Sequence, residues 1–374
     1  MPDSMHTETT KTQTKYWIAF TKIKGVGPQT FFKLLNYFSN LEEAWKTNNA
    51  DLIAAGIKES LAQEIIIEKN KIDPDAELEI LGKEKVGVIL YNDEDYPPLL
   101  KQIYSPPPLI FYRGDFNCLK KNCLAIVGAR KNTFYGQQTL EKLIPTLINY
   151  NLTIVSGLAI GVDCIAHQFC LKNNGTTAGV LGSGVDKNSV YPVSNRQIGE
   201  KIIDSGGCLL SEYGPGTMPN KQSFPLRNRI ISGLSLGTLI IEAGETSGSL
   251  ITAKYAVEQN REVFSIPGNI FSSQSKGTNN LIKQGAKLVN SADDILDELN
   301  IAQISQIKEE KGKVNLSAEE KLIMDLMSHE PIHIDKISQL CRIKINALLS
   351  LMITMELKGI IKDAGGQNYI KNLS

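Results

Sequence analysis

Between residues 91 and 300, seven short apolar runs alternate with helical segments, and this alternation limits the possible folds more than any other feature. The runs cover residues 124–127, 152–155, 177–181, 208–211, 238–241, 262–266 and 287–289. They are apolar almost throughout, which is typical of parallel strands that helices cover on both faces. The sequence therefore predicts an α/β domain with a doubly wound parallel sheet over residues 91–300.

The segment before this domain has a helical pattern. Residues 16–90 predict short helices, and the turn at residues 23–28 has a hydrophobic-Gly-hydrophobic-Gly pattern. This pattern resembles a helix-hairpin-helix, whose glycines allow backbone amides to approach a phosphate, but a tight packing turn explains it equally well. A second, looser unit is expected around Gly56. Residues 1–15 are rich in Thr and Lys and are expected to be a disordered tail.

The segment after the domain predicts a linker and a third domain. Residues 301–314 are polar and charged, and residues 315–374 contain three helical patterns and a closing hairpin, which suggests a winged helix. Ser317 and Glu320 form a capping box before the first of these helices. The expected recognition helix, residues 344–358, has basic groups at its two ends alone. A winged helix that reads DNA normally has a basic face, so protein contact is favoured here.

Composition narrows the functional classes. The chain has 40 basic and 40 acidic residues, so any contact with nucleic acid must come from a local patch. The six cysteines include no Cys-x-x-Cys pair, which predicts buried free thiols and no metal site. Free thiols and the lack of a signal peptide indicate the cytoplasm. No apolar run approaches the ~20 residues of a membrane span, so no membrane partner is expected.

A local patch of positive charge does exist at residues 213–241. It contains Lys221, Arg227 and Arg229 and no acidic residue. Two guanidiniums at the start of a helix that follows a strand predict an anion site. Polar groups also follow the other strands, and parallel strands bring such loops to one edge of a sheet. The sequence lacks the P-loop motif Gly-x-x-x-x-Gly-Lys-Ser/Thr. It also lacks a Gly-x-Gly-x-x-Gly motif after the first strand with an acidic residue ~20 residues later, as dinucleotide-binding domains have. The ligand of this site is therefore expected to be an extended polyanion and not a single nucleotide. Phe224 and Tyr213 are available for base stacking.

Long strings in the central domain resemble the DprA/Smf family of bacterial DNA-processing proteins. They are AIVGARKNTFYG, SGLAIGVDCIAH, VLGSGVDKNSVYPVSN, LLSEYGPGT, FPLRNRIISGLS, IIEAGETSGSLITAKYAVEQNREVFSIPG and GTNNLIKQGAKLV. The resemblance implies an extended Rossmann-like fold between an N-terminal helical SAM-like domain and a C-terminal winged helix. It also implies a homodimer without enzymatic activity or cofactor, which binds and protects incoming single-stranded DNA and loads the RecA recombinase during natural transformation.

Carried onto this sequence, the resemblance and the charge pattern together give a set of DNA-binding residues. They are Gly128, Arg130, Ser156, Gly157, Lys221, Phe224, Arg227, Asn228, Arg229, Ser247, Gly248 and Ser249. Arg227→Ala and Arg229→Ala are each expected to weaken binding to any sequence. Two positions depart from the family pattern, since Ala129 replaces a usual Ser or Thr and Leu226 replaces a frequent basic residue. Both changes are expected to alter affinity.

Two other functions stay open at this stage. A Rossmann-like nucleotide phosphoribohydrolase is suggested by Gly237-Thr238 with Glu242 and Glu245, and Asp163 and His167 lie four residues apart on one helix face, where they could form an acid–base pair. A protein-binding adaptor that acts through the winged helix is the other alternative.

Overall fold

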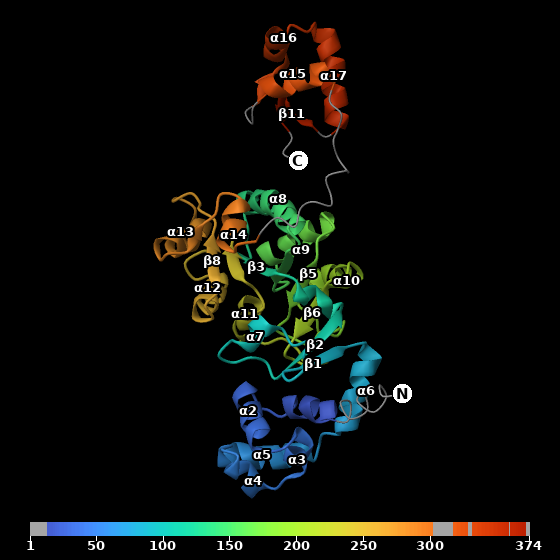
Figure 1. Ribbon diagram of the computed structural model, residues 1–374, viewed down its shortest axis with the longest axis vertical. Helices are drawn as coiled ribbons and strands as arrows, with labels where there is room; N and C mark the ends of the chain where they lie inside the picture. The colour runs from blue at the N-terminus through green and yellow to red at the C-terminus, as the bar shows by residue number, and fades with distance from the viewer. Residues whose placement is uncertain (1–12, 302–316, 328–330, 359, 372–374) are drawn as a thin grey trace. The chain divides into compact units, whose positions relative to one another are not determined.

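The computed structural model describes residues 13–301, 317–327, 331–358 and 360–371 (Figure 1). The chain forms two compact units, which divide between Ile304 and Ser305. The expected linker at residues 301–314 lies outside the described residues apart from Ile301, as does the expected tail up to residue 12. Residues 13–15 belong to a helix that continues to residue 21, so the boundary that we expected after residue 15 is wrong.

The first unit is built on a nine-stranded sheet with the order β1-β2-β6-β5-β4-β3-β7-β8-β9. All seven strands that the sequence predicts are present and run parallel to one another. They are β3 (Cys123–Val127), β4 (Thr153–Ser156), β5 (Thr177–Val180), β6 (Cys208–Ser211), β7 (Gly237–Ile240), β8 (Glu262–Ser265) and β9 (Lys287–Leu288). The order is that of a doubly wound α/β fold, as predicted.

Two strands at one edge of this sheet were missing from the prediction. These are β1 (Gly87–Leu90) and β2 (Leu109–Gly114), which pair antiparallel with each other and through β2 with β6. Both contain apolar runs like those of the central strands, at residues 86–91 and 109–112, but β1 lies in the segment that we expected to be helical and β2 precedes the first predicted strand. Because β1 belongs to the sheet, the boundary that we expected at residue 90 is wrong, and the helical part ends before residue 87.

Helices cover both faces of the sheet, and successive strand residues point to opposite faces. On one face, Leu124 and Ile126 of β3 pack with α8 (Phe134–Asn149), α9 (Val162–Lys172) and α14 (Asp293–Glu298). On the other face, Ala125 and Val127 pack with residues of α7 (Pro98–Lys101), α11 (Ser223–Gly233) and α12 (Ser249–Glu258). The remaining helices of this region are α10 (Arg196–Asp204) and α13 (Lys276–Lys283), with short 3-10 turns at Phe116–Lys120, Val193–Asn195 and Ser273–Ser275.

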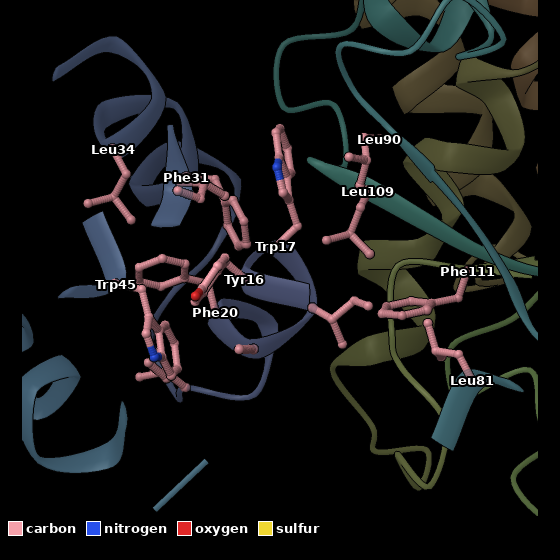
Figure 2. Packing of buried hydrophobic residues seen from close by; sticks show 14 of the residues in the cluster. Tyr16, Trp17, Phe20, Phe31, Leu34, Trp45, Leu81, Leu90, Leu109 and Phe111 are labelled. Atoms are coloured by element: carbon pink, nitrogen blue, oxygen red, sulfur yellow. The ribbon is translucent and has the colours of Figure 1, made fainter. Parts of the chain in front are cut away.

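The N-terminal helices pack directly against the sheet. After the helix at residues 13–21 come α2 (Pro28–Tyr37), α3 (Leu41–Lys46), α4 (Asn49–Ala54), α5 (Glu59–Lys69) and α6 (Pro74–Glu84). Figure 2 shows Trp17 and Phe20 of the first helix in one apolar cluster with Leu90, Leu109 and Phe111 of the sheet. This continuous core explains why the helical part and the α/β part form one compact unit.

Both glycine turns of the helical part are where the sequence places them. Gly25 lies between the first helix and α2, and Gly56 lies between α4 and α5. Their φ angles are +87° and +82°, a backbone conformation that favours glycine. This requirement accounts for the two glycines at the turns, and a phosphate contact at either turn stays a prediction.

The second unit is a winged helix, as predicted. It contains α15 (Ala318–Leu326), α16 (Ile334–Cys341) and α17 (Ile345–Leu357), and a sheet with the order β10 (Ile332–His333), β12 (Asn368–Lys371) and β11 (Ile361–Gly365). The capping box is confirmed, because Ser317 Oγ accepts from the Glu320 amide at 3.1 Å and the Glu320 carboxylate accepts from the Ser317 amide at 2.8 Å. An apolar core of its own, which includes Ile337, Leu348 and Met352, holds this unit together.

All six cysteines are buried and none forms a disulfide, as predicted. Within the described ranges, no three His, Cys, Asp or Glu side chains come together as metal ligands would. No single helix in these ranges has the length and apolar composition to cross a membrane, and α16 and α17 would reach that length only as a pair bent by 110°.

Candidate nucleic-acid interface

Loops at the carboxyl ends of the central strands enclose a hollow of about 800 Å³. The loops that follow β3 and β7 form two of its sides, and α11 forms another. Nine of the twelve predicted residues line it: Gly128, Arg130, Lys221, Phe224, Arg227, Asn228, Ser247, Gly248 and Ser249. The expectation that these loops meet at one sheet edge is therefore confirmed, and this convergence is what a doubly wound sheet provides.

Three exposed cations give the hollow its charge. Arg130 and Lys131 follow β3, and Lys221 precedes α11. None of the three forms an ion pair within the described part of the chain, whereas Lys276 at the start of α13 is paired with Glu245 at 3.5 Å. Lys131 is absent from the predicted set although it adjoins Arg130 in the sequence. Unpaired and solvated cations at the rim of a hollow favour binding of an anion.

Arg227 differs from these three because it is buried, with 4% of its surface exposed. Its Nη1 donates to the backbone carbonyls of Gly157, at 2.7 Å, and Val180. Burial lowers the pKa of Arg227 to about 10, and the positive charge of Arg130 acts in the same direction, against an opposing contribution from Asp163. Arg227 therefore ties the ends of β4 and β5 to α11 and places its charge in the floor of the hollow.

The expectation that Arg227 and Arg229 lie at the start of a helix is wrong. The helix α11 begins at Ser223, so Arg227 and Arg229 both lie in its second turn. The helix already includes Phe224, Pro225 and Leu226, which precede the two arginines. Proline is compatible with the first turn of a helix, and here it lies within that turn.

Arg229 does not reach the hollow. Its two terminal nitrogens donate to the two carboxylate oxygens of Glu212, each at 2.7 Å, and Nε donates to the carbonyl of Ser105 at 3.0 Å. Only 10% of the Arg229 side chain and 13% of the Glu212 side chain are exposed. Because the pair neutralises both charges and lines a different cavity, the structure separates Arg229 from Arg130 and Arg227.

Ser156 and Gly157 lie beneath the hollow and do not line it. Ser156 is completely buried, and its hydroxyl donates to the carbonyl of Ile126 at 2.6 Å. The amide of Gly157 donates to Asp163 Oδ2 at 3.1 Å, so it is not free for a phosphate. A Cβ atom at residue 157 would lie 2.6 Å from Nη2 of Arg227. Residue 157 is therefore a glycine because the buried Arg227 guanidinium leaves no room for a side chain. Our expectation that Ser156 and Gly157 contact DNA directly is not met.

Two aromatic rings stand beside the cations. The Arg130 guanidinium lies 6.0 Å from the centre of the Phe224 ring, and the Tyr191 ring lies 5.7 Å from it at an angle of 42°. Tyr191 is 47% exposed and lines the hollow, yet it was not among the predicted site residues. Its position after the Gly182-Ser183-Gly184 loop was the signal that could have identified it. An exposed ring and a half-buried ring next to these cations suit the stacking of unpaired bases.

The serine loop closes the other side. Ser247 Oγ and Ser249 Oγ share a hydrogen bond of 2.8 Å, and α12 begins at Ser249. Asn228 Nδ2 donates to the carbonyl of Gly248 at 3.3 Å, which joins α11 to this loop. Gly248 has open space on its Cβ side. The hydroxyls of Ser247 and Ser249 therefore lie at the hollow beside the positive end of the α12 dipole, an arrangement that favours phosphate oxygens.

The groups that suggested a phosphoribohydrolase have structural contacts instead. Glu242 is buried and accepts from the Thr133 amide at 2.8 Å and the Thr133 hydroxyl at 2.6 Å, which anchors the residue that caps α8. Glu245 pairs with Lys276. The Thr238 hydroxyl is buried inside β7. None of these groups lines the hollow.

His167 and Asp163 do not form an acid–base pair. The Thr177 hydroxyl donates to the carbonyl of Ile154 at 2.7 Å, so the 2.6 Å contact between His167 Nδ1 and Thr177 Oγ1 assigns the donor role to Nδ1. Burial lowers the pKa of His167 to about 3, and Arg227 adds to this effect. Burial raises the pKa of Asp163, whose Oδ2 accepts from Gly157. A completely buried neutral imidazole has no access to substrate.

Comparison with known proteins gives the family. The family model of DNA recombination-mediator protein A matches residues 87–300, and that of the DprA winged helix domain matches residues 308–367. The chain is 34% identical to Protein Smf of Synechocystis over 95% of this chain and 98% of the relative. It is 40% identical to the DNA processing protein DprA of Streptococcus pneumoniae over 76% of this chain and 98% of the relative.

Solved structures agree with these sequence relationships. The X-ray structure of DprA from Streptococcus pneumoniae superposes with a TM-score of 0.66 at 39% identity, over 76% of this chain and 97% of that one. DprA from Helicobacter pylori, whose structure was solved for its single-stranded DNA binding mode, superposes with a TM-score of 0.52 at 30% identity, over 58% of this chain and 96% of that one. The fold, the matched domains and these relatives establish that the chain belongs to the DprA/Smf family of DNA recombination mediators.

Proposed function

We propose that this protein binds single-stranded DNA in the hollow and acts in recombination as a mediator without catalytic activity. The observation that carries the proposal is the group of three unpaired cations, Arg130, Lys131 and Lys221, around the rings of Phe224 and Tyr191. Cations hold the phosphate backbone of any sequence. Exposed rings add stacking energy when the bases are not already paired, which favours a single strand over a duplex.

The relatives support the same class of ligand. The Helicobacter pylori protein is described by its single-stranded DNA binding mode, and the matched family is named for recombination mediation. A binding role is further supported because Glu242, Asp163 and His167, the candidate catalytic groups, are buried in structural contacts. Release of free base from nucleoside monophosphates by the purified protein would contradict this part of the proposal.

Fluorescence anisotropy with a labelled oligothymidine, and with a duplex of equal length, tests the proposal across a salt series. We expect tighter binding of the single strand and a steep loss of affinity with salt. Lys221→Ala should weaken binding, whereas Lys172→Ala should not, because Lys172 is an exposed lysine at the end of α9 that lies outside the hollow. Equal affinity for both oligonucleotides, or equal effects of the two substitutions, would contradict the proposed site.

We also propose that the protein is a cytoplasmic homodimer, as the resemblance implies. A surface for a second copy is available where Phe134 and Tyr135 meet the loop after β8. Tyr135 donates its hydroxyl to the carbonyl of Pro267 at 2.7 Å, and the same loop exposes Ile270 and 91% of Phe271. Contiguous exposed apolar side chains of this kind mark interaction sites. Sedimentation analysis should find a dimer that Phe271→Ser dissociates, and a monomeric wild type would contradict the proposal.

Loading of RecA is the remaining part of the proposal, and the winged helix is its candidate contact. Between Lys344 and Lys358, α17 has no basic residue, and it exposes Ile345 and Ile353. An apolar recognition helix supports protein contact more than DNA contact. Deletion of residues 315–374 should leave oligothymidine affinity unchanged and reduce the rate at which RecA filaments form on DNA coated by single-strand binding protein. Loss of DNA affinity in this deletion would instead indicate a DNA-binding winged helix.

A further inference from the structure

Two buried carboxylates lie behind the loops that surround the hollow. These loops, called the rim loops here, cover residues 128–133, 181–192, 212–222 and 241–248. Each contributes at least one residue to the hollow, namely Arg130, Tyr191, Lys221 and Ser247. The carboxylates belong to Asp186 and Glu242, which are 5% and 2% exposed and do not line the hollow themselves. Any effect of these two side chains on a bound strand therefore passes through the rim loops.

Glu242 joins the rim loop after β3 to the rim loop after β7. It is the second residue after β7, and its carboxylate oxygens accept from the amide of Thr133 at 2.8 Å and from the hydroxyl of Thr133 at 2.6 Å. Thr133 ends the loop that carries Arg130 and Lys131, and Glu242 lies in the loop that carries Ser247. One side chain thus fixes the two cations relative to the serine loop.

Asp186 makes the equivalent connection between the rim loops after β5 and β6. Its Oδ2 accepts from the amide of Ser189 at 3.2 Å and from the hydroxyl of Ser189 at 2.9 Å. Its Oδ1 accepts from the amide of Gly216 at 2.9 Å. Ser189 lies two residues before Tyr191, and Gly216 belongs to the loop that carries Lys221. Asp186 thus fixes the exposed ring relative to the third free cation.

The negative charges of Asp186 and Glu242 oppose the proposed ligand. Neither carboxylate is paired with a cation among the described residues, and both accept from N–H and O–H groups of the rim loops. A buried carboxylate repels a phosphate in the adjoining hollow, and salt screens a buried charge only weakly. The hydrogen bonds act in the opposite direction, because loops that are fixed before the strand arrives lose less conformational entropy on binding. The two effects have opposite signs and can be separated by experiment.

We propose that Asp186 and Glu242 are positioning residues of the DNA site. Their carboxylates hold the rim loops so that the free cations and the Tyr191 ring meet the strand together, and this gain exceeds the electrostatic cost of two buried negative charges. The inference rests on the proposed function, and it assigns a part in DNA affinity to two residues that do not contact the strand.

The test measures the affinity of the full-length protein for a labelled oligothymidine across a salt series. Glu242→Ala removes both bonds to Thr133 and should weaken binding roughly tenfold, the effect of one charge-assisted hydrogen bond to phosphate. The slope of log affinity against log salt should fall by about 0.7 for each phosphate contact that is lost, although the chain keeps all its cations. Asp186→Ala should have the same two effects.

Two further variants separate position from charge and from stability. Glu242→Gln removes the charge but keeps both bonds, since its side-chain amide accepts from the Thr133 amide and donates to the Thr133 hydroxyl, so it should bind at least as tightly as the wild type. Asp294→Ala is the matched control. The Asp294 carboxylate accepts from the amides of Asn290 at 2.7 Å and Ser291 at 3.0 Å, in a loop outside the hollow, so its loss should leave affinity and slope unchanged.

Each outcome decides the inference. Tighter binding by both Glu242→Ala and Glu242→Gln would show that charge alone matters and would overturn it. Equal weakening by these two variants, or a loss of affinity in Asp294→Ala as large as in Asp186→Ala, would also overturn it and leave the hollow as the DNA site. Absence of oligothymidine binding by the wild type would instead overturn the proposed function. Thermal unfolding identifies an alanine variant that fails to fold, and the other alanine variant then carries the test.

Discussion

The structure gives Arg130 and Arg229 opposite roles, and one comparison between them tests the proposed site most directly. Arg130 is exposed, is unpaired within the described part of the chain, and lies over the ring of Phe224. Arg229 is buried, forms a two-bond ion pair with Glu212 and faces away from the hollow. Arg130→Ala should therefore weaken DNA binding, and Arg229→Ala should weaken the fold, although the sequence alone predicts a DNA contact for both.

The magnitudes follow from these contacts. Loss of one phosphate contact should lower the slope of log affinity against log salt by about 0.7 for a single strand. A charge-assisted hydrogen bond contributes about 1.5–3 kcal/mol, and the lower value applies to Arg130 because it is exposed. Arg130→Ala should therefore weaken DNA binding by about tenfold. Arg229→Ala leaves the Glu212 carboxylate buried without its partner, which costs about 3 kcal/mol of unfolding free energy and leaves the salt slope unchanged.

Two measurements check these values. Anisotropy with labelled oligothymidine between about 50 and 200 mM salt gives the slope for each variant. Urea unfolding gives the stability, and Arg229→Met combined with Glu212→Leu should recover most of the loss, because no unpaired charge remains. The reasoning is refuted if Arg130→Ala leaves both affinity and slope unchanged, or if Arg229→Ala lowers the slope with no loss of stability.

Three further substitutions test other parts of the account. Gly157→Ala should lower the unfolding free energy by about 2 kcal/mol in urea titrations, because the new Cβ would lie 2.6 Å from Arg227 Nη2, and unchanged stability would contradict the packing described. Leu226→Arg should add an exposed cation on α11 next to Arg227 and raise the salt slope by up to about 0.7, whereas an unchanged slope would show that the strand does not reach residue 226. Burial gives His167 a pKa of about 3 in the folded state, against 6.5 in the unfolded state. Between these two pH values the unfolded state binds more protons, so the free energy of unfolding falls as the pH drops below 6.5, by about 1.4 kcal/mol per pH unit. Urea titrations at successive pH values should show that His167→Gln lacks this loss of stability at low pH, while the opposing effect of the raised Asp163 pKa stays the same. Identical pH profiles for the wild type and the variant would contradict the lowered pKa of His167.

The sequence by itself determined the central fold and the place of the site. Strands such as β3 and β5 are buried on both faces, so their apolar runs are continuous and can be recognised without an alignment. Parallel strands end at one edge, which is why the loops after β3 and β7 could be expected to meet. The strands β1 and β2 were missed although residues 86–91 and 109–112 are apolar, because β1 lies in the segment interpreted as helical and β2 stands before the first strand of the alternating pattern.

The direction in which each side chain of the site points was decided by the tertiary structure. Arg227 and Arg229 are two residues apart, and in an extended chain they would face the same side. They lie inside α11, where two residues correspond to a rotation of roughly 200°, so one guanidinium enters the hollow and the other meets Glu212 behind it. Burial of Ser156 under Ile126 is a tertiary contact of the same kind, because β3 supplies the acceptor from 30 residues away. Local sequence specifies which groups are present, but the packing of α11 against the sheet selects which of them a ligand can reach.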